Sequence, residues 1–236
     1  MADMGDSIDA ENANWTFGGE VCKTFDAHIN KSVPLYAKGH ELIIQVADFF
    51  LDNDSICYEL GCSTGALTQK LVERNKDKKI KIIAIDKEPQ MIQKAQERCG
   101  EIENVTFMAS DIVDLEMEKA DLIIAYYTMQ FVKSKNRQII FDRIFQSLNW
   151  GGGFLLFEKV RAPDARFQDM MTALYTEFKL ANGYKSEEII AKARSLKGIL
   201  EPFSTQGNYD LLTRAGFVDI MTIMKYVCFE GILAIK

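Results

Sequence analysis

A short glycine-containing stretch constrains the fold of this chain more than any other feature. Residues 56–60 (Ile-Cys-Tyr-Glu-Leu) form an apolar run of strand length, residues 61–65 (Gly-Cys-Ser-Thr-Gly) follow, and a helical pattern begins at Ala66. Glycine lets the backbone turn sharply and a ligand approach closely, and a helix start directs free N–H groups at that ligand. The stretch predicts a binding turn, although a tight strand-to-helix connection without a ligand explains it equally well. It is not a Walker phosphate loop, because no Gly-Lys-Ser/Thr follows.

The next predicted strand favours a nucleotide site. Residues 81–85 (Lys-Ile-Ile-Ala-Ile) are mostly apolar and end at Asp86. In nucleotide-binding α/β units, an acidic residue at the tip of the second strand accepts hydrogen bonds from the ribose hydroxyls of adenosine. Asp86 is also a candidate N-cap for the helix whose first turn Pro89 indicates. The two roles are compatible.

The order of the predicted elements indicates an α/β fold. Strands and helices alternate, which predicts a mostly parallel sheet with helices on both faces and a C-terminal antiparallel hairpin. The predicted helices are 21–36, 41–50, 66–73, 89–99, 137–148, 164–180, 186–196 and 208–215, and the predicted strands are 55–60, 80–85, 105–108, 122–126, 154–158, 218–229 and 231–235. Residues 160–207 predict a helical insertion over the carboxyl end of the sheet. We expect residues 1–14 to be disordered and residues 15–236 to form a single domain.

Composition argues against several functional classes. A net charge of −6 disfavours a broadly basic nucleic-acid surface, and no apolar run approaches the roughly 20 residues that span a bilayer. The five cysteines form no Cys-x-x-Cys pair, and His28 and His40 are the only histidines, so a metal cluster or a Ser-His-Asp triad has little material. We expect a cytoplasmic protein that acts on a small molecule, without a metal, a membrane or direct nucleic-acid binding.

Ligands of an open parallel sheet bind beyond the carboxyl ends of its strands. Asp111 and Ile112 follow one such end, where the carboxylate can accept from the exocyclic amine of an adenine and the isoleucine can pack on its ring. A loop aspartate that caps a short turn is the simpler explanation for Asp111 alone.

The pattern resembles the class I S-adenosylmethionine-dependent methyltransferase fold, which is Rossmann-like. Its first-strand motif is an acidic residue followed by Gly-x-Gly-x-Gly, and residues 59–65 read Glu-Leu-Gly-Cys-Ser-Thr-Gly, with Ser63 in place of the middle glycine. More narrowly, the chain resembles the carboxy-S-adenosyl-L-methionine synthase family along almost its whole length. The matching stretches are 14–17, 32–36, 60–63, 82–86, 128–131, 148–152, 158–159 and 178–184.

This resemblance implies a homodimeric bacterial enzyme that carboxylates the sulfonium methyl of S-adenosylmethionine, with prephenate as donor, for modification of tRNA wobble uridine. The cofactor would be S-adenosylmethionine or its carboxylated derivative. The candidate cofactor-binding residues are Tyr36, Glu59, Gly61, Cys62, Ser63, Gly65, Asp86, Lys87, Asp111, Ile112 and Tyr126. Arg194 matches the arginine that meets the extra carboxylate of the product, which a guanidinium fork can bind through two hydrogen bonds.

Tyr126 departs from the family pattern, which has an asparagine at this position. Asparagine offers a donor and an acceptor in a small volume, whereas tyrosine brings a large ring and one hydroxyl. The pocket must therefore differ, and catalysis is predicted to depend on Tyr126 and Arg194. One alternative is a conventional methyltransferase that aligns a small-molecule acceptor, with Tyr36, Tyr127 and Glu158 as further acceptor-side candidates. A non-catalytic ligand-binding module is the second alternative.

Overall fold

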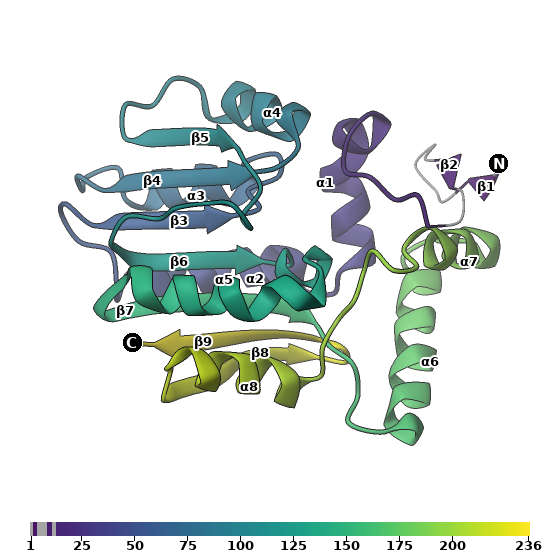
Figure 1. The fold of residues 1–236 in the computed structure, drawn as a ribbon. Helices are drawn as coiled ribbons and strands as arrows, with labels where there is room; N and C mark the ends of the chain where they lie inside the picture. The colour runs from purple at the N-terminus through teal and green to yellow at the C-terminus, as the bar shows by residue number, and fades with distance from the viewer. Residues whose placement is uncertain (1, 4–8, 11–12) are drawn as a thin grey trace.

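Seven strands form one sheet in the computed structural model, which describes residues 2–3, 9–10 and 13–236 (Figure 1). The order is β5-β4-β3-β6-β7-β9-β8; the first five strands are parallel, and β9 pairs antiparallel with both β7 and β8. The strands are β3 (Ile56–Leu60), β4 (Lys81–Asp86), β5 (Val105–Ala109), β6 (Ala120–Tyr126), β7 (Leu148–Lys159), β8 (Asp219–Tyr226) and β9 (Phe229–Ile235). The predicted α/β fold with its C-terminal hairpin is confirmed.

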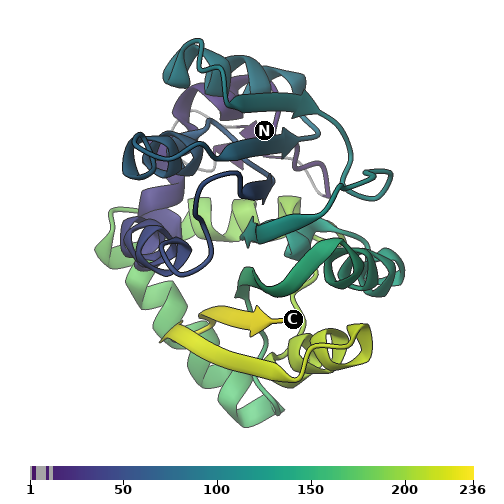
Figure 2. The ribbon, with the colours of Figure 1, turned by 90° about the vertical axis from the view of Figure 1, so that its left-hand side faces the viewer.

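Helices cover both faces of this sheet. The helices are α1 (Glu20–Ser32), α2 (Tyr36–Ala47), α3 (Ala66–Arg74), α4 (Pro89–Cys99), α5 (Ser134–Ser147), α6 (Ala165–Ala181), α7 (Ser186–Ser195) and α8 (Thr205–Ala215), with a 3-10 turn, η1 (Met129–Phe131). Figure 2 shows α2 and α3 on one side of the strands and α5 and α8 on the other. Strands buried on both faces need apolar side chains at successive positions, which explains the apolar run over residues 122–126 of β6.

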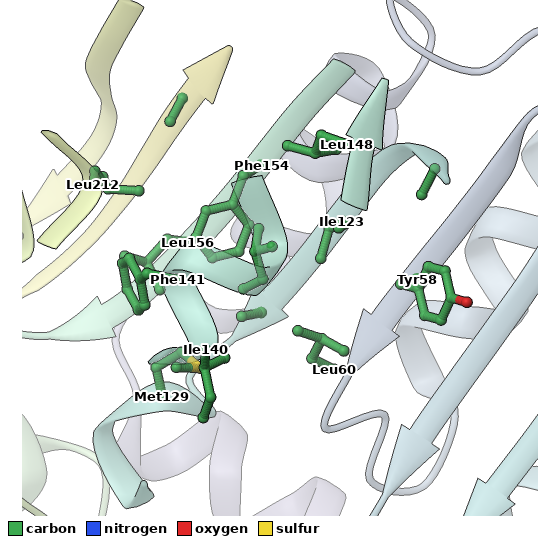
Figure 3. Close-up of a cluster of buried hydrophobic side chains, with 14 of the residues drawn as sticks. Tyr58, Leu60, Ile123, Met129, Ile140, Phe141, Leu148, Phe154, Leu156 and Leu212 are labelled. Atoms are coloured by element: carbon green, nitrogen blue, oxygen red, sulfur yellow. The ribbon is translucent and has the colours of Figure 1, made fainter. Parts of the chain in front are cut away.

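Two apolar clusters, one on each face, hold the layers together. Leu122 and Ile124 pack with α2 and α3, whereas the alternate residues Ile123 and Ala125 pack with α5 and α8. Figure 3 shows part of the second cluster, in which Phe141 of α5 and Phe154 of β7 meet edge to face with ring centroids 5.7 Å apart. The alternation along one strand therefore fixes the register of the sheet against both helical layers.

Several element boundaries differ from the predictions. The helix predicted over 21–36 ends at Ser32, because Pro34 cannot continue it, and α2 already begins at Tyr36. Strand β7 begins at Leu148 instead of residue 154, so the glycines predicted to stop the preceding helix lie inside a strand. A register shift against β6 accommodates them.

Helices α6 and α7 lie beyond the carboxyl ends of the parallel strands, beside α1 (Figure 1). The start of the chain runs along α7: the amide of Ala13 donates to the carbonyl of Arg194 at 3.1 Å, and that of Trp15 to Ser195 at 3.3 Å. We expected residues 1–14 to be disordered, and of these, residues 1, 4–8 and 11–12 lie outside the described residues. The short strands β1 (Ala2–Asp3) and β2 (Asp9–Ala10) pair antiparallel. In the described part of the chain, no helix has the length and apolarity to cross a membrane.

Candidate functional site

A cavity of about 940 Å³ opens at the carboxyl ends of β3, β4, β6 and β7. Helices α1, α6 and α7 contribute its outer wall. Its volume lies at the upper end of the range for small-molecule sites. The position agrees with the switch in strand order, because β4 and β5 lie on one side of β3 and β6 lies on the other.

The glycine loop turns tightly under this cavity. Gly61 has φ +84°, and the amides of Gly61 and Cys62 both donate to the carbonyl of Ile85, at 2.7 and 2.8 Å. A Cβ on Gly61 would lie 2.3 Å from Oγ1 of Thr128. Gly65 has φ +74° and packs against Ala95, so it shapes the start of α3 without lining the cavity. The turn is thus determined by backbone geometry that only glycine adopts easily.

Ser63 occupies the middle position of the motif with φ +49°. This left-handed region is costly for a residue with a Cβ, which is the physical reason that a glycine suits the position. The amide of Ser63 donates to Oδ2 of Asp86 at 3.0 Å and helps to hold the conformation.

Asp86 ends β4 and faces the cavity. Its Oδ2 accepts from Ser63, and its Oδ1 accepts from the amide of Glu88 at 2.9 Å. The N-cap of α4 is Glu88, without a side-chain cap hydrogen bond, so Asp86 stabilises the turn before the helix and does not cap it. A carboxylate offers about four lone-pair sites, and the remaining ones can accept from two ribose hydroxyls. Burial raises the pKa of Asp86. The arrangement fits an adenosine, whereas the predicted role of Asp86 as the cap of α4 is wrong.

Glu59 lies beneath the loop and lines the cavity, with only 2% of its surface exposed. Oγ1 of Thr68 donates to its Oε2 at 2.5 Å. Burial raises the pKa of Glu59 to about 8, and the nearby Asp86 adds to the shift. An ammonium group that entered the cavity here would favour the ionised form again.

Of the other predicted binding residues, Tyr36, Cys62, Lys87, Asp111 and Ile112 also line the cavity. Oδ1 of Asp111 accepts from the amide of Val113 at 2.9 Å, so this aspartate caps its turn, as the simpler explanation required. Of the predicted cofactor-binding and catalytic residues, the structure brings together every one except Gly65 and Arg194, and of the further acceptor-side candidates Glu158 does not line the cavity.

Arg194 is exposed on the outer side of α7 and does not line the cavity of its own chain. The residues of α7 that do are Ile189, Lys192 and Ala193, together with Leu196 directly after the helix. Their spacing of three and four residues marks one helix face, and Arg194 lies off that face. The predicted carboxylate contact therefore has no counterpart within a single chain.

Tyr126 forms part of the cavity wall, but its hydroxyl is already engaged. It donates to the carbonyl of Tyr36 at 2.6 Å, across the sheet–helix boundary. A Cβ on Gly39 would lie 2.2 Å from this hydroxyl oxygen, so a glycine inside α2 makes room for the large ring. The sequence predictions missed Gly39, because it falls between the predicted helices 21–36 and 41–50 and lies inside α2 only in the structure.

Tyr127 and Glu158 differ in access. Tyr127 lines the cavity, and its buried hydroxyl has no hydrogen-bond partner among the described residues. Glu158 is buried behind the wall and accepts from the amide of Gln130 at 3.1 Å; burial raises its pKa to about 8. Of the two, Tyr127 is the side chain that can meet a substrate.

Two lysines contribute the positive charge that sequence reasoning did not assign. Lys159 at the end of β7 and Lys179 on α6 line the cavity next to Tyr175. Both lysines lie in stretches that match the family, 158–159 and 178–184, but the approach of Lys179 to β7 depends on how α6 packs, which the sequence does not show.

Comparisons with known proteins agree with this geometry. The chain matches the family described as methyltransferase domain over residues 51–214. It is 34% identical to the carboxy-S-adenosyl-L-methionine synthase of Staphylococcus epidermidis, over 94% of this chain and 97% of that protein.

Two solved structures share the fold. Human N-acetylserotonin methyltransferase in complex with SAM has a TM-score of 0.63 and 19% identity; the match covers 92% of this chain and 56% of that chain. N-methyltransferase NodS from Bradyrhizobium japonicum in complex with S-adenosyl-l-homocysteine has a TM-score of 0.57 and 18% identity, over 88% of each chain. At such identities the likeness concerns the fold alone.

Proposed function

The chain belongs to the carboxy-S-adenosyl-L-methionine synthase family of methyltransferase-domain proteins, and on that premise we propose that it carboxylates the sulfonium methyl of S-adenosylmethionine. It is an S-adenosylmethionine-dependent transferase. The observation that carries the proposal is the extent of the match. Because it spans 94% of this chain, it includes the helices that wall the cavity and not only the nucleotide loop.

The residues around the cavity fit this substrate. Asp86 has free acceptor sites for the ribose hydroxyls, and Asp111 and Ile112 can meet the adenine. Glu59 and Tyr36 line the region next to the loop, where the methionine part would lie. S-adenosylmethionine supplies a methyl group whose C–H bonds are acidified by the adjacent sulfonium.

The proposal extends to prephenate as the carboxyl donor and to tRNA wobble-uridine modification as the use of the product. In the balanced reaction, one C–C bond of the donor and one methyl C–H bond break, and one new C–C bond forms. The electron pair left on the donor expels its hydroxide, which leaves as water with the methyl proton. No oxidant or reductant is needed.

The family resemblance also leads us to propose a homodimer in the cytoplasm. Phe167, Met170 and Leu174 of α6 are about half exposed and lie three and four residues apart, which makes one apolar helix face. A second copy covering this face would give Arg194 a ligand to reach, in the cavity of the other copy. The five unpaired cysteines fit a reducing compartment. Sedimentation velocity tests the dimer.

A conventional methyltransferase remains the second candidate. It is favoured by Tyr126, whose ring replaces the family's asparagine, and by the absence of Arg194 from the cavity of its own chain. In that case the protein would only need to align an acceptor with the methyl group.

Mass spectrometry of a reaction with S-adenosylmethionine and prephenate distinguishes the two functions. We expect the carboxylated derivative, formed in step with consumption of prephenate. Formation of S-adenosylhomocysteine with a methylated acceptor, and no carboxylated product, would overturn the proposal in favour of methyl transfer. The ligand that survives purification provides an independent check.

A further inference from the structure

Two lysines share one aromatic ring in the wall of the cavity. The Nζ atoms of Lys159 and Lys179 each lie 4.4 Å from the centroid of Tyr175, so they are at most twice that distance apart. Lys179 and Tyr175 are one turn apart on α6, and the Tyr175 hydroxyl donates to the carbonyl of Ser32 at 2.8 Å. This hydrogen bond fixes the ring between α6 and α1. We call these three residues the lysine pair site.

The two ammonium groups have no counter-ion in the described part of the chain. Neither Nζ makes an ion pair or a hydrogen bond to a carboxylate there. The charged or titratable groups around them are Arg161, the other lysine, and the Cys228 thiol, whose pKa is raised by burial. Burial lowers the pKa of both lysines, that of Lys179 to about 8. Partly buried cations without a counter-ion are costly, and an anion would relieve that cost.

The position of the site separates it from the adenosine. Lys159 ends β7 and Asp86 ends β4, and β3 and β6 lie between these strands. Three steps of about 4.8 Å across the sheet place the two strand ends roughly 14 Å apart. The lysine pair site therefore lies three strand spacings away from the carboxylate that would hold the ribose.

We propose that the lysine pair site binds the carboxylate groups of the second substrate, an organic dicarboxylate. The inference rests on the proposed carboxylation and names the side chains that hold its donor. The apolar neighbours Tyr127 and Phe229 line the same part of the cavity, which suits an organic anion with a ring or hydrocarbon body better than inorganic phosphate. Binding one carboxylate on the lysines would leave the transferable carboxyl directed at the methyl group.

The test replaces each lysine by methionine in the full-length protein. Lys159→Met and Lys179→Met keep the length of the stem and can still pack on Tyr175. Lys135→Met is the matched control, because Lys135 is exposed on α5 and does not line the cavity. Lys179→Arg keeps the positive charge and should retain the dicarboxylate binding that Lys179→Met loses.

Two measurements are made on each variant. Calorimetry gives the affinity of the protein saturated with S-adenosylhomocysteine for malonate and for prephenate, and steady-state kinetics gives KM for prephenate. We expect about a 10- to 100-fold loss of affinity for both anions in the two methionine variants, which is typical for loss of a charged hydrogen bond. Affinity for S-adenosylhomocysteine should change by less than about twofold, because the site is remote from the ribose.

The outcomes separate this inference from the proposed function. If the wild type carboxylates S-adenosylmethionine but both methionine variants bind prephenate as the control does, the lysine pair site is wrong and the function stands. If the wild type forms no carboxylated product but malonate binding requires the lysines, the reaction is wrong and the anion site stands. Failure of the wild type to bind either anion overturns the lysine pair site.

Discussion

The cavity has two halves that are built in different ways. In the adenosine half, at the ends of β3, β4 and β5, the polar side chains already have partners within the chain: Asp86 accepts from two amides, Asp111 from one and Glu59 from Thr68. In the substrate half, at the ends of β6 and β7, Tyr127 and the two lysines have no such partners among the described residues.

This difference separates what the fold requires from what a particular reaction requires. Internal hydrogen bonds preorganise the adenosine half, so it can be shared by proteins that use S-adenosylmethionine for different purposes. The unpartnered groups of the substrate half are costly in the free protein, and a bound ligand would relieve that cost. Substrate specificity should therefore depend on the residues of the substrate half. The stability of the glycine loop, residues 61–65, should depend on the adenosine half.

The largest expected effect is on the stability of the adenosine half. Gly61→Ala combines a positive φ with a Cβ placed 2.3 Å from Thr128, and we expect a loss of about 4 kcal/mol in the free energy of unfolding. Urea denaturation measures it. Gly100→Ala is the control, because Gly100 also has positive φ but nothing within 4 Å of its Cβ position. Its cost should be about 1 kcal/mol. Equal costs would show that the contact with Thr128 is unimportant.

The second prediction concerns the interlock of α2 with the substrate half. Glycine to alanine inside a helix normally stabilises by about 1 kcal/mol, but at Gly39 the new Cβ would lie 2.2 Å from the Tyr126 hydroxyl. We expect Gly39→Ala to lower the free energy of unfolding by about 2 kcal/mol in the wild type. In a Tyr126→Asn background, where the ring is gone, the same change should be stabilising.

A double-mutant cycle measured by chemical denaturation checks this coupling. Additive effects of Gly39→Ala and Tyr126→Asn would mean that the glycine does not serve to admit the ring. In that event, the large side chain of Tyr126 would not be the reason for the packing of α2 against the substrate half.

The same division explains how much could be predicted from the sequence. The adenosine half depends on contacts between the ends of consecutive strands, such as Ser63 with Asp86, and its loop and carboxylate were both predicted. The mostly parallel sheet and its C-terminal hairpin followed from the alternation of elements, whereas the order of the strands was not predicted. Gly39 with Tyr126, and Lys179 with Lys159, meet only through tertiary packing, so no local pattern indicates them. Strand β7 was placed late because glycines usually interrupt a strand, and here a register shift retains them.

The third prediction contrasts the ligands of the two halves. Asp86→Ala removes the acceptor for the ribose hydroxyls, and we expect about 1.5–3 kcal/mol weaker binding of S-adenosylhomocysteine by calorimetry. Malonate binding by the same variant should be unchanged, because the lysine pair site lies across the sheet. Unchanged affinity for S-adenosylhomocysteine would rule out the ribose role, and a parallel loss of malonate binding would show that the two halves are not independent.

The smallest effect is the pH dependence of stability, in which the two halves should have opposite signs. Burial raises the pKa of Glu59 from 4.5 to about 8, so between these values the native state holds more protons than the unfolded state. Stability therefore falls as pH rises over that range. Burial lowers the pKa of Lys179 from 10.5 to about 8, so the unfolded state holds more protons above pH 8 and stability rises.

Urea denaturation of Glu59→Gln and Lys179→Met across pH 5–10 separates the two contributions. Glu59→Gln should reduce the fall below pH 8, and Lys179→Met should reduce the rise above it, each by on the order of 1 kcal/mol, because water reaches the cavity and moderates the cost of charge. A dicarboxylate bound at the lysine pair site should likewise remove the rise, since it stabilises the protonated lysine in the native state. If malonate leaves the rise intact, Lys179 does not face the bound anion, and the contrast between the two halves loses its electrostatic basis.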